Sequence, residues 1–217
     1  VDVYGVQNNY MLFSSDNQIP GASIYGASYN YNLGLDKSAR VNALYSHNPL
    51  NGISTYLSSG GAQLKLAENH QLELRGGLSS ETGPQGRHPG MASGINYHGR
   101  SGDWDIGLNN YYSTSHYSGM QRGVLQLDER VSYTIQPATT VFVRYNRLQN
   151  APAYSGINFS MLSYSNEITT YETGVQVAFA KFHLGLRPYL MGQRLNSTRL
   201  NYEGATNLSS ARSRVAV

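Results

Sequence analysis

The stretch Glu68-Asn69-His70-Gln71-Leu72-Glu73-Leu74-Arg75-Gly76-Gly77-Leu78-Ser79 decides the fold of this chain. A short polar turn comes first, and apolar and polar residues then alternate one by one. Successive side chains of a β-strand point to opposite sides, so strict alternation places each set on its own face. The same alternation recurs at 40–46, 62–66, 104–109, 130–135, 171–179 and 182–187. The sequence therefore predicts an all-β fold built from two-faced strands.

Short polar turns recur at nearly constant spacing, with centres about 33, 33, 35 and 43 residues apart. They are Asp36-Lys37-Ser38, Glu68-Asn69-His70, Ser101-Gly102-Asp103, Gln136-Pro137-Ala138 and Ala180-Lys181. We expect them to form one rim of an up-and-down sheet. Longer loops are expected on the other rim, at 15–21, 49–55, 82–90, 113–119, 150–167 and 193–197. The last repeat is about ten residues longer than the others, and we place the excess in 150–167.

The pattern predicts about twelve strands, near 3–13, 22–35, 39–48, 56–67, 71–81, 91–100, 103–114, 120–135, 139–149, 168–179, 182–192 and 198–210. Most span 10 to 14 residues, whereas strands of globular proteins average about 5–6. A tilted strand needs about 9–11 residues to cross a membrane. We therefore predict one domain over 1–217, a transmembrane antiparallel up-and-down β-barrel or a segment of a larger barrel.

The composition excludes several classes of protein. Charged residues make up 13% of the chain, against about 25% on average, and Gly (23) and Tyr (18) are abundant. No apolar run is long enough for a transmembrane helix, and a disordered chain would lack the aromatic residues. The chain has no cysteine, which excludes disulfides and thiolate metal sites. The net charge of +3 is scattered, which disfavours nucleic acid as a partner.

The start of the chain shows no signal peptide. Val1-Asp2-Val3-Tyr4 already has the pattern of a strand, so we interpret the sequence as a mature chain or an excised segment.

Aromatic residues that the alternation places on the outer face of the predicted barrel gather near both ends of the predicted strands. They are Tyr97, Trp104, Tyr112, Tyr133, Tyr145, Tyr171, Phe179 and Phe182. Two such rows, separated by small and aliphatic residues, are typical of the interfacial girdles of membrane barrels. The alternative interpretation is that Tyr is simply a good strand former.

One strand fits this scheme badly. Glu129 shares parity with Leu125 and Leu127 and would face lipid. A β-bulge near Asp128-Glu129 would correct the parity, and a position at the membrane interface would lower the cost of the charge.

These features resemble a Gram-negative outer-membrane β-barrel. Gly94-Ile95-Asn96-Tyr97-His98-Gly99 and Trp104-Asp105-Ile106-Gly107-Leu108-Asn109-Asn110-Tyr111 have the style of porins and of larger export or usher barrels. The resemblance implies a location in the bacterial outer membrane, with the lipid bilayer as one partner. It also implies further barrel segments or subunits of a secretion or transport complex as partners, and no cofactor.

Such barrels commonly end on an aromatic residue, usually Phe. This chain ends Arg214-Val215-Ala216-Val217, and a further short turn is due at 210–213. We therefore expect either a chain that stops partway round a larger barrel or a truncated chain.

Charged residues of the opposite parity are the candidate lumen lining. They are Arg40, Lys65, Glu73, Arg75, Asp105, Arg130, Arg144, Glu172, His183 and Arg187. Charge along a water-filled pore selects ions by sign, and the basic excess predicts a mild anion preference if the pore is open. The alternative is a plug of Arg–carboxylate pairs. Small barrels are filled and large ones open, so both alternatives stay open at about twelve strands.

Catalytic and metal chemistry find little support. The six histidines form no HxxxH or HExxH pair, and no G-x-S-x-G elbow occurs. We therefore expect no catalytic residues and no metal. The leading hypothesis is a pore, or the wall of a translocation channel, for solutes or exported polymer. A surface-exposed adhesin or structural β-protein is the alternative, and an outer-membrane lipase or protease is a third.

Overall fold

The computed structural model describes residues 2–7, 23–34, 36–50, 52–119, 121–151, 164–179, 184–186, 189–201 and 204–216. These ranges form long strands connected in chain order. The strands are β1 (Asp2–Gln7), β2 (Ser23–Gly34), β3 (Lys37–Asn48), β4 (Ile53–Ala67), β5 (His70–Gly83), β6 (Gly86–Ser101), β7 (Trp104–Ser113), β8 (Val124–Gln136), β9 (Thr139–Asn150), β10 (Tyr164–Phe179), β11 (Leu184–Leu186), β12 (Tyr189–Asn201) and β13 (Gly204–Ala216).

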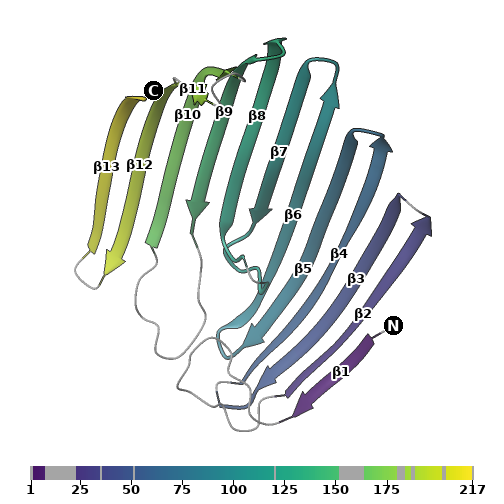
Figure 1. Ribbon diagram of the computed structural model, residues 1–217. Helices are drawn as coiled ribbons and strands as arrows, with labels where there is room; N and C mark the ends of the chain where they lie inside the picture. Colours follow the sequence, from purple (N-terminus) through teal and green to yellow (C-terminus); the bar gives the residue numbers. More distant parts are fainter. Residues whose placement is uncertain are drawn as a thin grey trace.

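Neighbouring strands pair antiparallel in a single sheet (Figure 1). The order in space is the order in sequence from β1 to β10, followed by β12 and β13, and the short β11 pairs with β10 beside this path. The prediction of an all-β, antiparallel, up-and-down architecture is confirmed.

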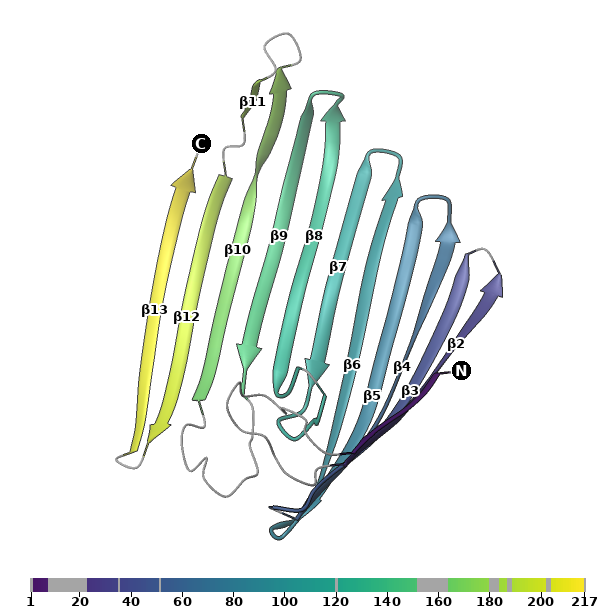
Figure 2. The same cartoon turned by 60° about the horizontal axis from the view of Figure 1, so that its bottom comes forward.

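The sheet is curved and open. In Figure 2 the lower parts of β1 to β4 are seen nearly edge-on, whereas β8 to β13 face the viewer. The edges are β1, which pairs with β2, and β13, which pairs with β12. The described strands therefore do not close into a barrel, because no ladder joins the two edges.

Four of the five predicted short turns lie where the alternation placed them, at 36, 68–69, 102–103 and 137–138. Gly102 has φ +57°, a left-handed conformation that glycine adopts without steric cost. The fifth turn, at 180–181, lies outside the described residues.

The opposite rim differs from the prediction. The loop predicted at 82–90 is wrong, because β5 and β6 continue into a tight turn at Pro84-Gln85, and Gly86 at φ +111° permits it. The loop predicted at 193–197 is wrong, because these residues lie within β12. The turn expected at 210–213 is also wrong, because β13 runs through it. The predicted loop 15–21 and residues 152–163 lie outside the described residues.

The register separates the sheet into two faces. Arg40, Gly61, Arg75, Gly94 and Tyr111 form one row of directly paired residues from β3 to β7, and we call their side the polar face. The residues next to them in sequence lie on the opposite side, which we call the apolar face.

Exposed apolar side chains mark the apolar face. The large apolar residues that stay exposed lie on this face, including Val41, Leu78, Val143 and Tyr171. The exception is Leu50, which lies in a turn. Among the described residues few side chains are buried, because nothing packs against this face. Within the same ranges, no helix has the length and apolarity of a helical membrane span.

Rows of directly paired residues across the strands, which we call ladder rows, do not run parallel to the rim of short turns. Their distance from this rim increases from β5 to β10. One row joins Leu72, Tyr97, Leu108, Glu129, Tyr145 and Tyr171. Leu72 lies two residues from the turn-side end of β5, whereas Tyr171 lies eight residues from the turn-side end of β10. The strands are therefore tilted relative to the rim, as in sheets that curve toward a cylinder.

Candidate functional site

The polar face collects the charged residues that the sequence assigned to a lumen. Register places eight of them on this face, namely Arg40, Lys65, Glu73, Arg75, Asp105, Arg130, Arg144 and Glu172. His183 and Arg187 lie outside the described residues.

Several of these charges are paired within the sheet. Arg75 forms a two-pronged contact with Glu73, with N–O distances of 2.7 and 2.9 Å. Arg144 binds Asp128 in the same manner, at 2.9 Å for both contacts. Charge-assisted, two-pronged bonds fix the orientation of both partners. The charge on this face is therefore organised into local pairs rather than one uniform field.

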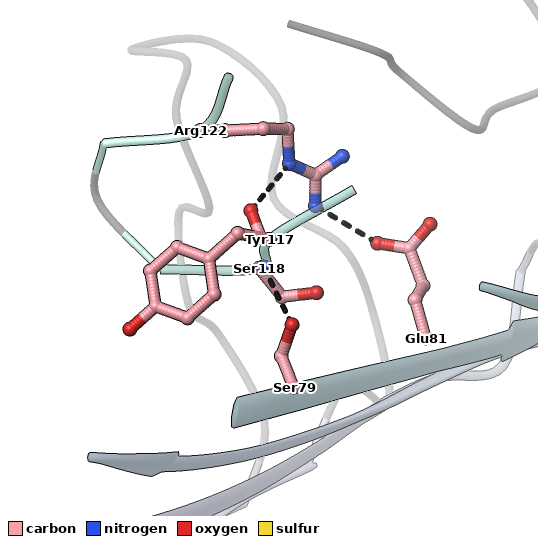
Figure 3. Close-up of polar contacts among 5 residues, drawn as sticks. All are labelled: Ser79, Glu81, Tyr117, Ser118 and Arg122. Atoms are coloured by element: carbon pink, nitrogen blue, oxygen red, sulfur yellow. Dashed lines mark hydrogen bonds and ion pairs between the residues drawn. The ribbon is translucent and has the colours of Figure 1, made fainter. Parts of the chain in front are cut away.

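The loop between β7 and β8 folds over the polar face. It comprises residues 114–119 and 121–123 as described, and we call it the inner loop. Arg122 donates from its guanidinium to Glu81 on β5 at 3.0 Å, and Arg122 also donates to the Tyr117 carbonyl at 2.9 Å (Figure 3). The backbone N–H of Ser118 donates to the Ser79 hydroxyl at 3.0 Å. These contacts join the loop to a strand about forty residues earlier in the chain.

The Arg122–Glu81 pair is largely removed from water. The side chains are 19% and 10% exposed, respectively. Removing one partner of such a pair strongly destabilises the folded protein, because the other partner is left as an uncompensated charge.

Tyr117 packs onto glycines of the sheet. A Cβ atom at Gly77 would overlap the Tyr117 ring, and one at Gly90 would lie 2.5–2.6 Å from the loop backbone at Tyr117 and His116. Tyr117 is 6% exposed, and this burial raises the pKa of its phenol above the ordinary value. The ring of His116 stacks on that of His88 of β6, with centroids 4.8 Å apart.

Sequence reasoning missed Ser79, Glu81, Tyr117 and Arg122. These contacts join distant segments, so no local periodicity reveals them. One signal was present, because Gly77 occupies a strand position of polar-face parity, where a missing side chain permits close approach of another segment.

The apolar face carries the aromatic residues that the sequence singled out. Trp104 and Tyr133 face each other across β7 and β8, with ring centroids 4.8 Å apart, and Tyr145 and Tyr171 do so across β9 and β10, at 5.2 Å. Tyr97 lies on the same face and hydrogen-bonds to His70 at 2.8 Å. Phe182 and the side chain of Phe179 are not among the described parts of the chain.

Aromatic residues stand at both ends of the strands on this face. On β7, Trp104 and Tyr112 are eight residues apart, which at about 3.3 Å per residue is about 26 Å. Three further aromatic residues of this face, Tyr25, Tyr45 and Tyr56, were not predicted from the sequence. Their rings lie side by side on adjacent strands, with centroids 6.3 Å apart for Tyr25 and Tyr45 and 4.7 Å apart for Tyr45 and Tyr56.

Glu129 lies on the apolar face without the suggested bulge. The pairing of β7 with β8 keeps its register on both sides of it, and the irregularity of β8 lies between Thr134 and Gln136. Asn110 donates to the Glu129 carboxylate at 3.1 Å, and the Asp128 N–H donates to Asn110 at 3.3 Å. The amide side chain, rather than a change of face, therefore accommodates this charge.

No group of three or more metal-ligating side chains occurs in the part of the chain that the structure describes. The chain matches no known protein family model, and the search of curated proteins and that of solved structures gave no match either.

Proposed function

We propose that this chain forms part of the wall of a β-barrel in a bacterial outer membrane. In this proposal about twelve of its strands cross the bilayer. The apolar face contacts lipid, and the polar face lines a pore or translocation channel for solutes or exported polymer.

The observation that carries the proposal is the uncovered apolar face. Monomeric soluble proteins rarely expose contiguous apolar patches larger than a few hundred Å². Here exposed apolar side chains extend over strands from β2 to β10, with Tyr29, Leu74 and Val143 as examples. Lipid is the environment in which such a face is favourable.

Strand length and aromatic placement support the same proposal. Most described strands have 10 to 16 residues, enough for a tilted crossing. The apolar band of a membrane barrel is about 25 Å tall and is flanked by aromatic residues, and the Trp104–Tyr112 spacing is comparable.

The polar face supports a channel role rather than catalysis. It combines paired charges with many amides and hydroxyls, and pore selectivity arises from such lining groups. In this proposal the chain acts without a cofactor, and its partners are the bilayer and further strands of a transport or secretion complex.

The first test is conductance. The full chain, refolded in detergent and added to a planar bilayer, is expected to produce stepwise current increases. A chain that stays soluble without detergent and gives no channels contradicts the proposal and favours the adhesin or structural alternative.

A second test assigns the two faces. The chain has no native cysteine, so single cysteines can be introduced without background. Val41 on the apolar face is 56% exposed, and Asn42 beside it lies on the polar face. In lipid vesicles, we expect a membrane-impermeant thiol reagent to modify Asn42→Cys at least tenfold faster than Val41→Cys. Equal rates would contradict lipid contact at Val41.

A further inference from the structure

A half-open cavity, lined by both polar and apolar groups, lies on the polar face beside Tyr117 of the inner loop. Its volume is about 550 Å³, and residues of strands β2 to β7 line it together with Tyr117. Cavities of about 300–1,000 Å³ are typical of small-ligand sites. The cavity is built by the sheet itself, and Gly61, on the polar face, adds no side chain to it.

Most hydrogen-bonding groups of this lining are uncharged. Its amide side chains are those of Asn30, Asn32, Asn42 and Gln63. Each amide offers both donors and acceptors. A ligand hydroxyl also donates and accepts, so amides complement it in either role.

The carboxylate of the lining is already paired with a guanidinium. Glu73 accepts from Arg75 through both carboxylate oxygens. Arg40 donates to the Asn42 amide oxygen at 2.9 Å. A cationic ligand would have to compete with Arg75 for the carboxylate, which disfavours it.

Two phenol rings complete the lining. Tyr111 lies beside Gly94, where an added Cβ would come within 3.2 Å of the ring, and Tyr117 lies over Gly77. A phenol combines an apolar ring with a polar hydroxyl. A sugar ring has the complementary character, with apolar C–H groups on its faces and hydroxyls at its edge.

We propose that this cavity is a binding subsite for an uncharged, polyhydroxylated solute of the size of a short oligosaccharide. The proposal rests on the proposed channel function and specifies the class of solute that the channel takes. Amides bind the hydroxyl groups, and Tyr111 and Tyr117 contact the carbon faces.

Binding is measured first, on the detergent-solubilised full chain, so that the result is independent of conductance. Isothermal titration with a linear glucose tetramer is expected to show saturable binding. Ser59 lines the cavity, and its neighbour Ser58 lies on the apolar face. We expect Ser59→Trp to weaken binding at least tenfold by filling the cavity and Ser58→Trp to leave it unchanged.

A second matched pair covers the case in which Ser59→Trp does not fold. Tyr111 lies on the polar face and Tyr112 on the apolar face. Tyr111→Ala is expected to weaken tetramer binding at least fivefold, and Tyr112→Ala to retain it. Absence of binding by the folded wild-type chain overturns the proposal, and so does equal loss in both members of a folded pair.

Conductance separates this inference from the function on which it rests. Channels that conduct but are not blocked by the glucose tetramer contradict the subsite and leave the channel intact. Tetramer binding without any conductance supports the subsite and contradicts the channel. Tighter binding of a hexuronic acid tetramer, with Arg40 as its partner, overturns the uncharged class.

Discussion

The guanidinium of Arg122 and the carboxylate of Glu81 meet at 3.0 Å, although 41 residues separate them in the chain. This pair holds the inner loop against β5 on the polar face. Both side chains are mostly buried, so the docked loop depends on the charges remaining matched.

Glu81→Gln is expected to release the inner loop. A hydrogen bond to a charged group contributes about 1.5–3 kcal/mol, and a loss of about 2 kcal/mol raises the open population roughly 30-fold. Limited trypsin digestion checks this, because the bond after Arg122 is cleaved only when the loop opens. Glu73→Gln, which disrupts the pair with Arg75 and none of the hydrogen bonds that join the loop to β5, is the control. Identical cleavage rates in Glu81→Gln and the wild type would show that the pair does not hold the loop.

Gly90→Ala is expected to displace the inner loop by steric overlap. The added methyl group would meet loop backbone at 2.5–2.6 Å, and overpacking of this kind costs about 1–3 kcal/mol. Gly107→Ala on the same face meets nothing within 4 Å and serves as the control. Increased trypsin cleavage and larger single-channel conductance are expected for Gly90→Ala alone. Equal behaviour of the two variants would contradict the docked position of the loop.

Alkaline pH is expected to weaken loop docking through Tyr117. Burial raises the pKa of this phenol in the docked state, so the docked loop retains the proton more strongly. Docking is therefore at full strength below the ordinary tyrosine pKa of about 10, and it weakens as the pH rises through the raised pKa.

Subtilisin cleavage of the loop between pH 8 and pH 11 measures this effect, with an unstructured peptide in the same tube to correct for protease activity. Tyr117→Phe cannot ionise and is expected to show a flatter profile. If the pH profile of Tyr117→Phe matches that of the wild type, groups other than Tyr117 cause the alkaline effect.

Asn110→Ala is expected to destabilise the sheet in lipid. Its amide donates to the Glu129 carboxylate on the apolar face, and an unsatisfied charged group costs about 1–3 kcal/mol or more. Asn109→Ala, on the opposite face, is the control. Urea unfolding in vesicles, followed by Trp104 fluorescence, should show a lower midpoint for Asn110→Ala. A larger effect at Asn109 would place Glu129 in water.

Local alternation was sufficient to predict the strands from β2 to β10 and their two faces, but not the end of the chain, where strands were predicted at 182–192 and 198–210 and β12 and β13 lie at Tyr189–Asn201 and Gly204–Ala216. Leu72, Leu74 and Arg75 lie on the sides that parity assigned to them, because side-chain direction along a strand is a local property. The tight turn at Pro84-Gln85 was missed, since Thr-Gly-Pro-Gln-Gly has the composition of a longer loop.

Contacts between distant segments could not be predicted in this way. The pairing of Arg122 with Glu81 depends on how the β7–β8 loop folds back, and alternation within strands carries no information about that. Glu129 shows the same limit, because its partner Asn110 lies on another strand.

The increasing distance of the ladder rows from the rim of short turns has a geometric consequence for any closed cylinder that contains this sheet. Each hairpin adds to the offset between a row and the turn rim, so the offset accumulates from one edge of the sheet to the other. Any cylinder built on this sheet must absorb the accumulated offset as its shear, which together with strand number fixes strand tilt and diameter. If further strands closed this sheet into a cylinder, the pairing that joins the edge at β1 to the edge at β13 would carry the accumulated offset. In such a cylinder, the displaced register would limit which strands can pair with both edges.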